Sequence, residues 1–407
     1  MTSHNPPRVL LLVPLTVVPF LLYYTSDLLT PGDMLFWKKV ENRRNTTSSL
    51  LELKDADSVY SGRLEGVTGT ANSSMEKPNA GKTRALQKFR SYAQHIPKEE
   101  VAQKKFLADQ AAVRSIPTEA PGWVYNKTAA DLFRNTMIRD RRFVNGNFLV
   151  TQKSVKKVMK TWGRTTKIIK VPKDVFKGFP KESPFKNKRF NTCSVVGNGG
   201  ILTGSGCGKE IDASEFVLRL NMATMDEKYL EDIGKKTNLI TINPSMISYR
   251  YLYTRKKVKT INVKALMSDL SVYGDSYLWS WAFEGLDQTK IVFKAQQALQ
   301  ANSARVQVIF PYPVLTGSLI SFWRKNGVNG KKATTGLLLV GLATQMCEEV
   351  RLYGFWPFHS DRNNRHLTEH YYDNAFPTNV HRIPDEFRQL QRLHNTGVLR
   401  LTTHTCQ

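Results

Sequence analysis

The chain begins with an apolar segment bounded by charges. Residues 9–24 form a continuous apolar run between Arg8 and Asp27 that contains two prolines. A membrane-spanning helix needs roughly 20 apolar residues, so the run lies at the short end of that range. We interpret residues 9–26 as an uncleaved signal anchor that follows a cytosolic tail of residues 1–8. A cleaved signal peptide is the alternative interpretation.

Residues 27–130 are mostly polar and show only weak apolar periodicity. They are rich in Ser, Thr, Asn, Lys and Glu, a composition that disfavours a packed core. We therefore interpret this segment as an exposed stem, in which residues 84–113 could form a polar helix. An Asp-Ala-Asp sequence at residues 55–57 has the form of a metal–nucleotide site. Because it lies in the stem, we interpret it as a chance occurrence.

From residue 190 onward, short apolar segments alternate with longer amphipathic ones. The predicted strands are residues 193–197, 215–221, 238–243, 306–310, 350–354 and 399–403. The predicted helices are residues 289–301, 315–325, 336–348 and 384–395. This alternation predicts an α/β fold whose central sheet is mostly parallel and is covered by helices on both faces. Ligands of such sheets bind at the carboxyl ends of the strands.

Basic residues greatly outnumber acidic ones. The chain has 59 Lys and Arg against 34 Asp and Glu, a formal net charge of +25, which indicates an anionic partner such as nucleic acid, a membrane surface or an acidic substrate. The segment 153–189 holds thirteen basic residues and two acidic ones. Their spacing at its start would suit one face of a helix. The segment is either a solvated surface or a surface that attracts a polyanionic acceptor. With 41% hydrophobic residues, the chain is not a disordered polyelectrolyte.

Cysteines and glycosylation sequons indicate the compartment. The sequons all precede residue 130 and begin at Asn45, Asn72 and Asn126. Together with an anchor, they are typical of a lumenal segment, in which four cysteines would form two disulfides. The cysteines are Cys193, Cys207, Cys347 and Cys406. Four cysteines allow three pairings.

Two backbone motifs could bind a ligand. At residues 195–200 a predicted strand runs into a glycine-rich turn, which could hold a nucleotide sugar or a dinucleotide, or could simply be a tight turn. At residues 332–336, Thr334 or Thr335 can cap the helix that follows. The start of that helix would then favour a phosphate or carboxylate.

Histidines at two places could transfer a proton. His370 opens a His-Tyr-Tyr-Asp sequence, and His381 is followed by Glu386. Imidazole titrates near neutrality, so either ring could accept or donate a proton at a reacting oxygen. No His-Glu-x-x-His, Cys-x-x-Cys or carboxylate cluster indicates a metal site.

Taken together, these segments resemble the animal sialyltransferases, and in particular their α2,8-sialyltransferase branch. Residues 193–225 are similar to the large motif of that family, and residues 334–358 to its small motif. Residues 370–373 resemble the third motif, and His381 with Glu386 fits the very short His-x4-Glu motif. All four occur in the order found in the family, within residues 183–406.

The resemblance implies a Rossmann-like variant of the glycosyltransferase A fold. It implies transfer of sialic acid from CMP-sialic acid to the O8 hydroxyl of a terminal sialic acid, with inversion and with neither metal nor cofactor. His381 would be the general base, and His370 would stabilise the departing phosphate. The donor would contact Asn198, Asn221, Thr334, Thr335, Gly336 and Trp356. The cysteines would pair as Cys193–Cys347 and Cys207–Cys406.

An enzyme of this kind would be a single-pass type II protein of the Golgi membrane, with residues 131–407 as its lumenal catalytic domain. Its acceptors would be sialylated glycoproteins or glycolipids, and it could form a homodimer. Polysialylation stays open, because residues 303–332 carry five basic residues and no acidic one. A catalytically silent sialoglycan-binding protein is a second alternative. A nucleic-acid-binding protein is suggested by charge alone.

Overall fold

The computed structural model describes residues 123–137, 146–155, 158–161, 167–255, 258–330, 332–374 and 381–406. The predicted anchor, most of the predicted stem, the sequons at Asn45 and Asn72, and the Asp-Ala-Asp sequence lie outside the described residues. Within the ranges given above, no helix is both long enough and apolar enough to cross a membrane.

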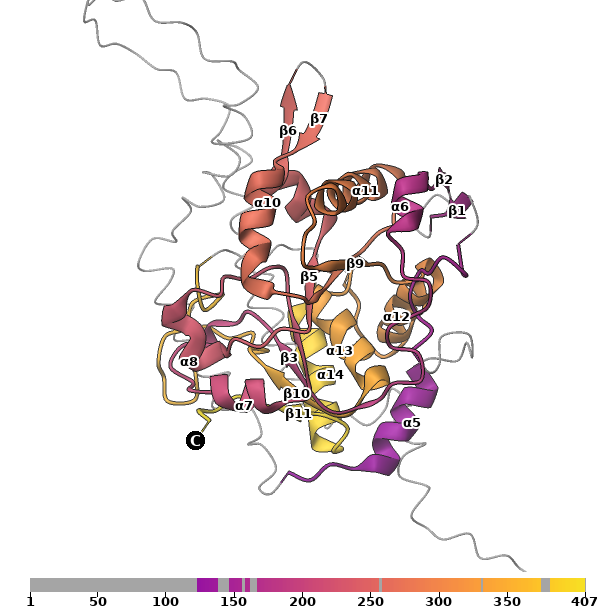
Figure 1. Ribbon diagram of the computed structural model, residues 1–407. Helices are drawn as coiled ribbons and strands as arrows, with labels where there is room; N and C mark the ends of the chain where they lie inside the picture. Colours follow the sequence, from indigo (N-terminus) through magenta and orange to yellow (C-terminus); the bar gives the residue numbers. More distant parts are fainter. Residues whose placement is uncertain are drawn as a thin grey trace, which may run out of the picture. The chain divides into compact units, whose positions relative to one another are not determined.

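A seven-stranded sheet in which every neighbouring pair is parallel forms the centre of the structure (Figure 1). The strand order is β11-β10-β3-β4-β5-β8-β9. Its strands are β3 (Phe190–Val196), β4 (Phe216–Arg219), β5 (Leu239–Ile242), β8 (Tyr277–Ser280), β9 (Gln307–Ile309), β10 (Cys347–Tyr353) and β11 (Arg400–Leu401). The strand order reverses at β3, because β4 lies on one side of it and β10 on the other. The predicted α/β fold with a mostly parallel sheet is confirmed.

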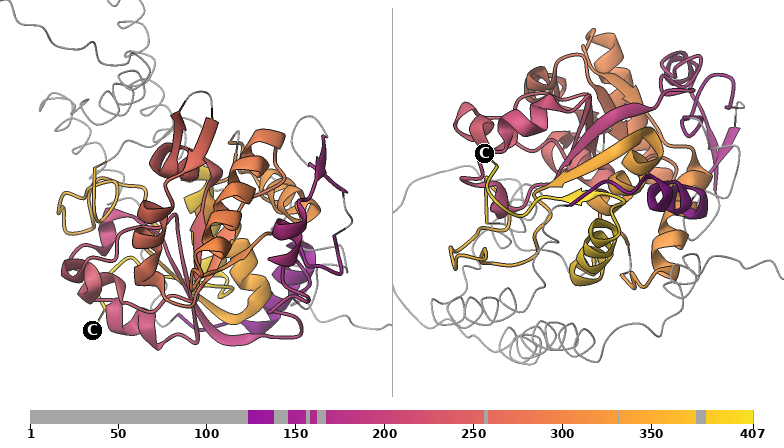
Figure 2. Two further views of the ribbon diagram at one scale, coloured as in Figure 1. Left: turned by 45° about the horizontal axis from the view of Figure 1, so that its top comes forward. Right: turned by 90° about the horizontal axis from the view of Figure 1, so that it is seen from below.

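Helices cover both faces of this sheet (Figure 2). One face carries α7 (Gly208–Ala213), α8 (Leu230–Ile233), α10 (Val263–Leu270) and α11 (Leu286–Ala301). The other face carries α5 (Lys127–Met137), α12 (Pro313–Lys325), α13 (Thr335–Met346) and α14 (Ile383–Asn395). On the first face, apolar side chains of α10 and α11 share one core with those of β5, β8 and β9. Short segments complete that side: α6 (Lys173–Lys177), α9 (Pro244–Met246) and a π-helix at Ile247–Tyr251.

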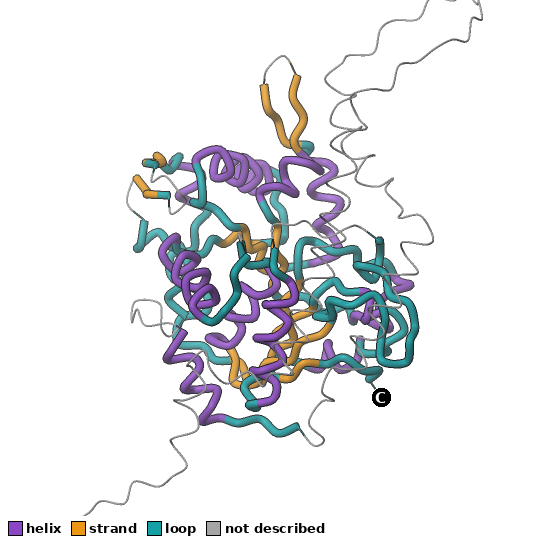
Figure 3. Tube along the Cα trace, turned by 180° about the vertical axis from the view of Figure 1, so that it is seen from behind, coloured by secondary structure: helices purple, strands orange, loops and turns teal. Residues whose placement is uncertain are grey.

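Helix α13 is the most deeply buried helix of the fold. All but two of its residues are buried, as expected for a helix that is apolar on every side. Its predicted end at residue 348 is wrong. The helix stops at Met346 because Cys347 already pairs with Phe190 as the first residue of β10. Residues 354–374, which follow β10, are drawn as loop in Figure 3.

Two small hairpins lie outside the central sheet. The prediction of a basic helical face at the start of the segment 153–189 is wrong, because β1 (Val158–Lys160) and β2 (Ile168–Lys170) form an antiparallel pair there. In each strand only the middle residue is buried, which is the two-residue periodicity of a strand and not that of a helix. Strands β6 (Leu252–Arg255) and β7 (Val258–Ile261) form the second hairpin, which projects from the body in Figure 1.

The packed part of the chain starts before the predicted domain boundary at residue 131. Helix α5 begins at Lys127, and the side chain of Asn126 caps it by accepting a hydrogen bond from the Ala129 N–H (3.0 Å). Arg134 is buried and donates to the carbonyl oxygens of Thr344, Cys347 and Glu348 at 2.6–2.9 Å. These contacts fix α5 against the junction between α13 and β10.

Candidate active site

Asparagines follow the carboxyl ends of three neighbouring strands. Asn198, Asn221 and Asn243 each lie within two residues of the end of β3, β4 or β5. Because these strands are parallel, the three residues lie along one edge of the sheet, where α/β folds bind ligands. The start of α13 reaches the same edge, since the Asn243 Nδ2 lies 3.2 Å from the Thr335 Oγ1.

The glycine-rich turn after β3 packs against the backbone of β10. A side-chain carbon at Gly197 or at Gly199 would lie 2.7 Å from the carbonyl oxygen of Gly354. The N–H of Gly199 donates to that oxygen at 3.0 Å. Both glycines are therefore required by the close approach of two strand ends, which supports the tight-turn interpretation.

This turn also positions His370. The carbonyl of Asn198 accepts a hydrogen bond from the Tyr371 N–H at 2.9 Å. Gly199 and His370 form an isolated antiparallel β-bridge. The Asn198 amide donates to the Leu220 carbonyl at 3.4 Å. Asn198 and His370, which are far apart in sequence, thus lie together at the end of β3.

Asn221 adopts a left-handed backbone conformation, with φ of 53°. Asparagine tolerates this conformation better than most residues because its short polar side chain bonds locally. The Asn221 N–H donates to the Thr241 Oγ1 at 2.8 Å, and that hydroxyl lies 3.3 Å from the Asn221 Oδ1. Strand β5 therefore fixes the orientation of this amide.

Helix α13 begins with a side-chain cap that is itself held by a carboxyl group. The Thr334 Oγ1 accepts a hydrogen bond from the Leu337 N–H at 3.0 Å. The Thr334 N–H donates to the Glu386 Oε1 at 2.8 Å, and its hydroxyl contacts the Glu386 Oε2. Among the described residues, no acceptor contacts the N–H groups of Thr335 and Gly336. Those two groups, with the positive end of the helix dipole, are available for an anion.

Gly336 is also restricted by packing. A side-chain carbon there would lie 3.0 Å from the ring of Phe355 and 3.4 Å from Leu220. The helix start is therefore pressed against the segment that follows β10.

Glu386 is a buried carboxyl group beside this cap. Its residue is 5% exposed. Burial raises the pKa of the Glu386 carboxyl to about 7; the hydrogen bonds from Thr334 oppose this shift, and the nearby Asp385 adds to it. The sequence does not predict the contact between Glu386 and Thr334. It indicates Glu386 only as the acidic residue of the His-x4-Glu motif that begins at His381. Capping residues are recognisable in a sequence, but a partner 52 residues away is not.

We expect Glu386 to make stability depend on pH. The pKa of the Glu386 carboxyl is raised in the folded protein. Its favourable contribution to the free energy of unfolding is therefore complete below about pH 4.5 and is lost as pH rises through about 7. Glu386→Gln keeps an acceptor for the Thr334 N–H and cannot ionise. In urea unfolding, the variant should match wild type near pH 4 and exceed it at pH 8 by about 2–4 kcal/mol. A stability difference that does not change with pH would contradict this assignment.

His381 lies close to the same cap. Its Nδ1 is 2.9 Å from the carbonyl oxygen of Lys332. Since a carbonyl only accepts hydrogen bonds, Nδ1 must carry the proton. In the neutral ring the lone pair then lies on Nε2, and this nitrogen can act as a base.

His370 is oriented by its own motif. Its Nδ1 lies 2.7 Å from the Asp373 Oδ1, and its ring stacks on Tyr372 with 5.2 Å between the ring centroids. The Asp373 carboxylate accepts from Nδ1–H, so Nε2 is the nitrogen available to a ligand.

Trp356 is part of an aromatic cluster. It is 8% exposed, its indole N–H donates to the Ser360 carbonyl at 2.8 Å, and its ring packs edge-on against Phe358 and Phe387. Little of its surface is left for a ligand. Its predicted contact with the donor stays a prediction.

The structure contains the disulfides that the resemblance implies. Cys193–Cys347 joins the neighbouring strands β3 and β10, and Cys207–Cys406 joins the start of α7 to the chain end. The Cys406 N–H also donates to the Ser205 carbonyl at 2.8 Å. In the part of the chain that the structure describes, no three His, Cys, Asp or Glu side chains form a group that could hold a metal.

Comparison with known proteins gives one family. The model of Glycosyltransferase family 29 (sialyltransferase) matches residues 143–398. Alpha-2,8-sialyltransferase 8F of Mus musculus is 40% identical over 242 residues, which cover 59% of this chain and 60% of that protein. Alpha-N-acetylneuraminide alpha-2,8-sialyltransferase of Xenopus tropicalis is 36% identical over 301 residues, which cover 72% of this chain and 84% of that protein.

One solved structure among the matches is a mammalian sialyltransferase in complex with Gal-beta-1-3GalNAc-ortho-nitrophenol. It aligns with 20% sequence identity and a TM-score of 0.38, over 72% of this chain and 92% of the other.

Proposed function

Because the chain belongs to glycosyltransferase family 29, the sialyltransferases, we propose that it transfers sialic acid from CMP-sialic acid to the O8 hydroxyl of a terminal sialic acid. Relatives named alpha-2,8-sialyltransferases support this linkage. The observation that carries the catalytic part is the hydrogen bond between the His381 Nδ1 and the Lys332 carbonyl, because it leaves Nε2 as the basic nitrogen.

In the proposed reaction, Nε2 of His381 takes the proton from the acceptor O8. The oxygen forms a bond to C2 of the donor sialic acid while the bond from C2 to the phosphate oxygen breaks. CMP leaves with the electron pair, and attack from the opposite side inverts the configuration at C2. A positioned base of this kind contributes about 10²–10⁴-fold to the rate.

Negative charge grows on the phosphate as CMP departs. We propose that the N–H groups of Thr335 and Gly336 at the positive end of α13 stabilise it, together with Nε2–H of His370 when that ring is protonated. Asn198 and Asn221 would hold the nucleotide part of the donor. These groups supply charge stabilisation from the protein, so we propose transfer that needs no metal.

We also propose that the protein is a type II Golgi membrane protein with a lumenal catalytic domain. The sequon at Asn126 supports a lumenal position. Asn126 is exposed, and its Oδ1 rather than its amide nitrogen caps α5. The nitrogen that would carry a glycan therefore remains available. A homodimer stays a prediction.

The test is transfer of labelled sialic acid from CMP-sialic acid to three acceptors: a sialylated glycolipid, a short sialylated glycan and a sialylated glycoprotein. We expect at least one acceptor to gain one or a few residues. Long products would favour the alternative, polysialylation, for which the basic residues of segments 153–189 and 303–332 are the motivating observation. Binding of sialylated glycans without transfer to any acceptor would favour a catalytically silent binding protein.

A further inference from the structure

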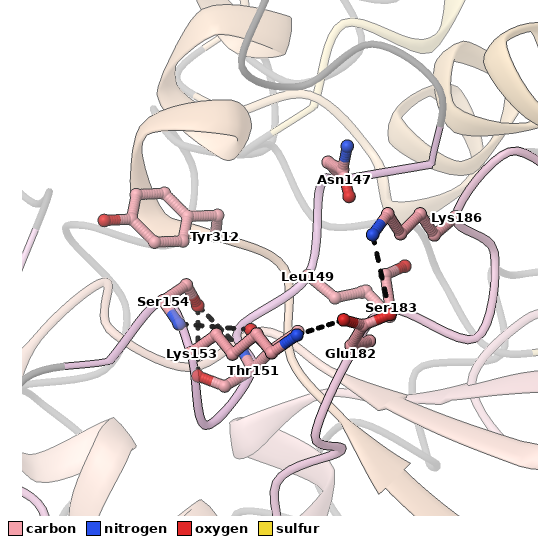
Figure 4. Close-up of a pocket in the computed structure, with 9 residues that line it drawn as sticks. All are labelled: Asn147, Leu149, Thr151, Lys153, Ser154, Glu182, Ser183, Lys186 and Tyr312. Carbon is pink, nitrogen blue, oxygen red and sulfur yellow. Dashed lines mark hydrogen bonds and ion pairs between the residues drawn. The ribbon is translucent and has the colours of Figure 1, made fainter.

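A cavity of about 360 Å³ opens beside the end of β9 (Figure 4). None of the residues assigned to the transfer reaction lines it. Its wall includes Asn147, Lys153, Ser154, Glu182, Lys186 and Tyr312. It therefore needs an explanation separate from the donor site.

The walls of this cavity are built by two segments that the fold holds firmly. Residues 148–150 run antiparallel to the chain leaving β9: the Val150 N–H donates to the Phe310 carbonyl at 2.9 Å, and the Tyr312 N–H to the Phe148 carbonyl at 2.8 Å. The opposite wall is fixed by the Ser183 hydroxyl, which donates to the Gly146 carbonyl. The two segments are also joined by the buried rings of Phe148 and Phe185, which stack with 5.8 Å between their centroids. The cavity is preformed, as ligand sites usually are.

The charged side chains that line the cavity carry a net positive charge, because two lysines face one glutamate. Lys153 and Lys186 both contact the carboxylate of Glu182, the second at 3.5 Å. The side chains of the two lysines are 73% and 45% exposed, so each ammonium group has donors left for a ligand. Figure 4 shows the Lys153 and Lys186 ammonium groups on either side of Glu182.

The remaining lining suits a sugar ring. Tyr312 offers an aromatic ring that is half-buried, and Asn147 an exposed amide. An aromatic face packs against the C–H face of a sugar, while an amide bonds its hydroxyl groups. Together with a cationic surplus, this lining fits a sugar that carries a carboxylate.

One wall of the cavity follows the carboxyl end of a strand, whereas the opposite wall flanks Phe185, whose ring packs against Phe216 and Tyr277 at the amino ends of β4 and β8. Tyr312 follows the carboxyl end of β9, as Asn243 follows that of β5, and β8 is the strand between them. Neighbouring strands are about 4.8 Å apart, so the two strand ends are roughly 10 Å apart along the edge. A sugar in the cavity would thus be a different residue of the glycan from the one that reacts.

We propose that this cavity binds a carboxylate-bearing sugar of the acceptor glycan, at a distance from the sialic acid that receives the new residue. The proposal rests on the proposed function, because it assumes that the acceptor is a sialylated glycan. It assigns part of the basic segment 153–189 to a defined site.

The test compares two double variants that remove the same charge. Lys153→Gln with Lys186→Gln alters the cavity, whereas Lys173→Gln with Lys177→Gln removes two exposed lysines of α6 from the same basic segment. Binding of an α2,8-linked oligosialic acid is measured by titration without donor. Acceptor and donor KM values are then measured with an oligosialylated glycoprotein glycan, an oligosialylated glycolipid and a short monosialylated acceptor.

For the cavity variant, we expect about a tenfold weaker Kd and higher KM for the oligosialylated acceptors, with the donor KM and the short acceptor unchanged. The α6 variant should change these values by less than about twofold. Preference for one of the oligosialylated acceptors identifies the natural source of the sugar. Equal effects of both variants, no effect, or no binding by wild type would overturn the proposal. If wild type transfers to no acceptor but binds oligosialic acid through these lysines, the proposed function fails and the cavity assignment stands.

Discussion

Replacing His381 with alanine should lower kcat by about 10²–10⁴-fold and leave the affinity for CMP-sialic acid within about twofold of wild type. Donor affinity should hardly change because the His381 ring and the proposed donor site are held by different contacts. The ring is held by a hydrogen bond to the Lys332 carbonyl, and the helix start proposed to bind the donor has its own supports in Thr334 and Glu386. Steady-state kinetics with a sialylated acceptor and donor titration measure the two quantities separately.

His381→Asn makes this test sharper. Its amide can still donate to the Lys332 carbonyl, but it has no basic nitrogen for the acceptor proton. It should be about as inactive as the alanine variant. His404→Ala, which removes an exposed histidine near the chain end, should keep wild-type kcat. A His381 variant with wild-type kcat would exclude this residue as the base.

Removing the Cys207–Cys406 disulfide should lower the free energy of unfolding by about 2–5 kcal/mol. The bridge spans 199 residues, and in the chain-entropy model so long a loop restricts the unfolded chain strongly. Cys207→Ser and Cys406→Ser should each reduce the yield of folded protein and lower the urea midpoint.

The double variant Cys207→Ser with Cys406→Ser provides the control. Either single change already breaks the bridge, so the second change has no further bridge to remove. The double variant should therefore be at least as stable as the less stable of the two single variants. It also lacks the unpaired thiol that each single variant retains. Wild-type stability and yield in both single variants would show that the bridge contributes nothing.

The sheet could be predicted where a strand reads as a short segment rich in Val, Ile or Leu. Residues 193–197 and 238–243 have that composition and contribute to β3 and β5. Strand β8, Tyr277–Ser280, was missed because its sequence of Tyr, Leu, Trp and Ser shows no aliphatic run. It becomes a strand because β5 and β9 pair with it on both sides, and only the folded chain provides those partners.

The resemblance assigned roles to the candidate site residues, whereas only the folded structure shows their contacts. No local pattern places Glu386 against Thr334, or the Lys332 carbonyl against His381, because α14 must first pack beside the start of α13. The glycines after β3 gave an ambiguous signal for the same reason. These positions require glycine because the carbonyl oxygen of Gly354, which directly follows β10, comes close to them. Gly354 lies more than 150 residues later in the chain.

The most direct test of the central claim is the linkage of the product. Purified protein is incubated with carbon-13-labelled CMP-sialic acid and a short acceptor ending in sialic acid, and the isolated product is examined by NMR and methylation analysis. We predict a new bond from C2 of the labelled sialic acid to O8 of the acceptor sialic acid, with inverted configuration at C2. Transfer to another hydroxyl, or release of CMP without a glycan product, would contradict the account.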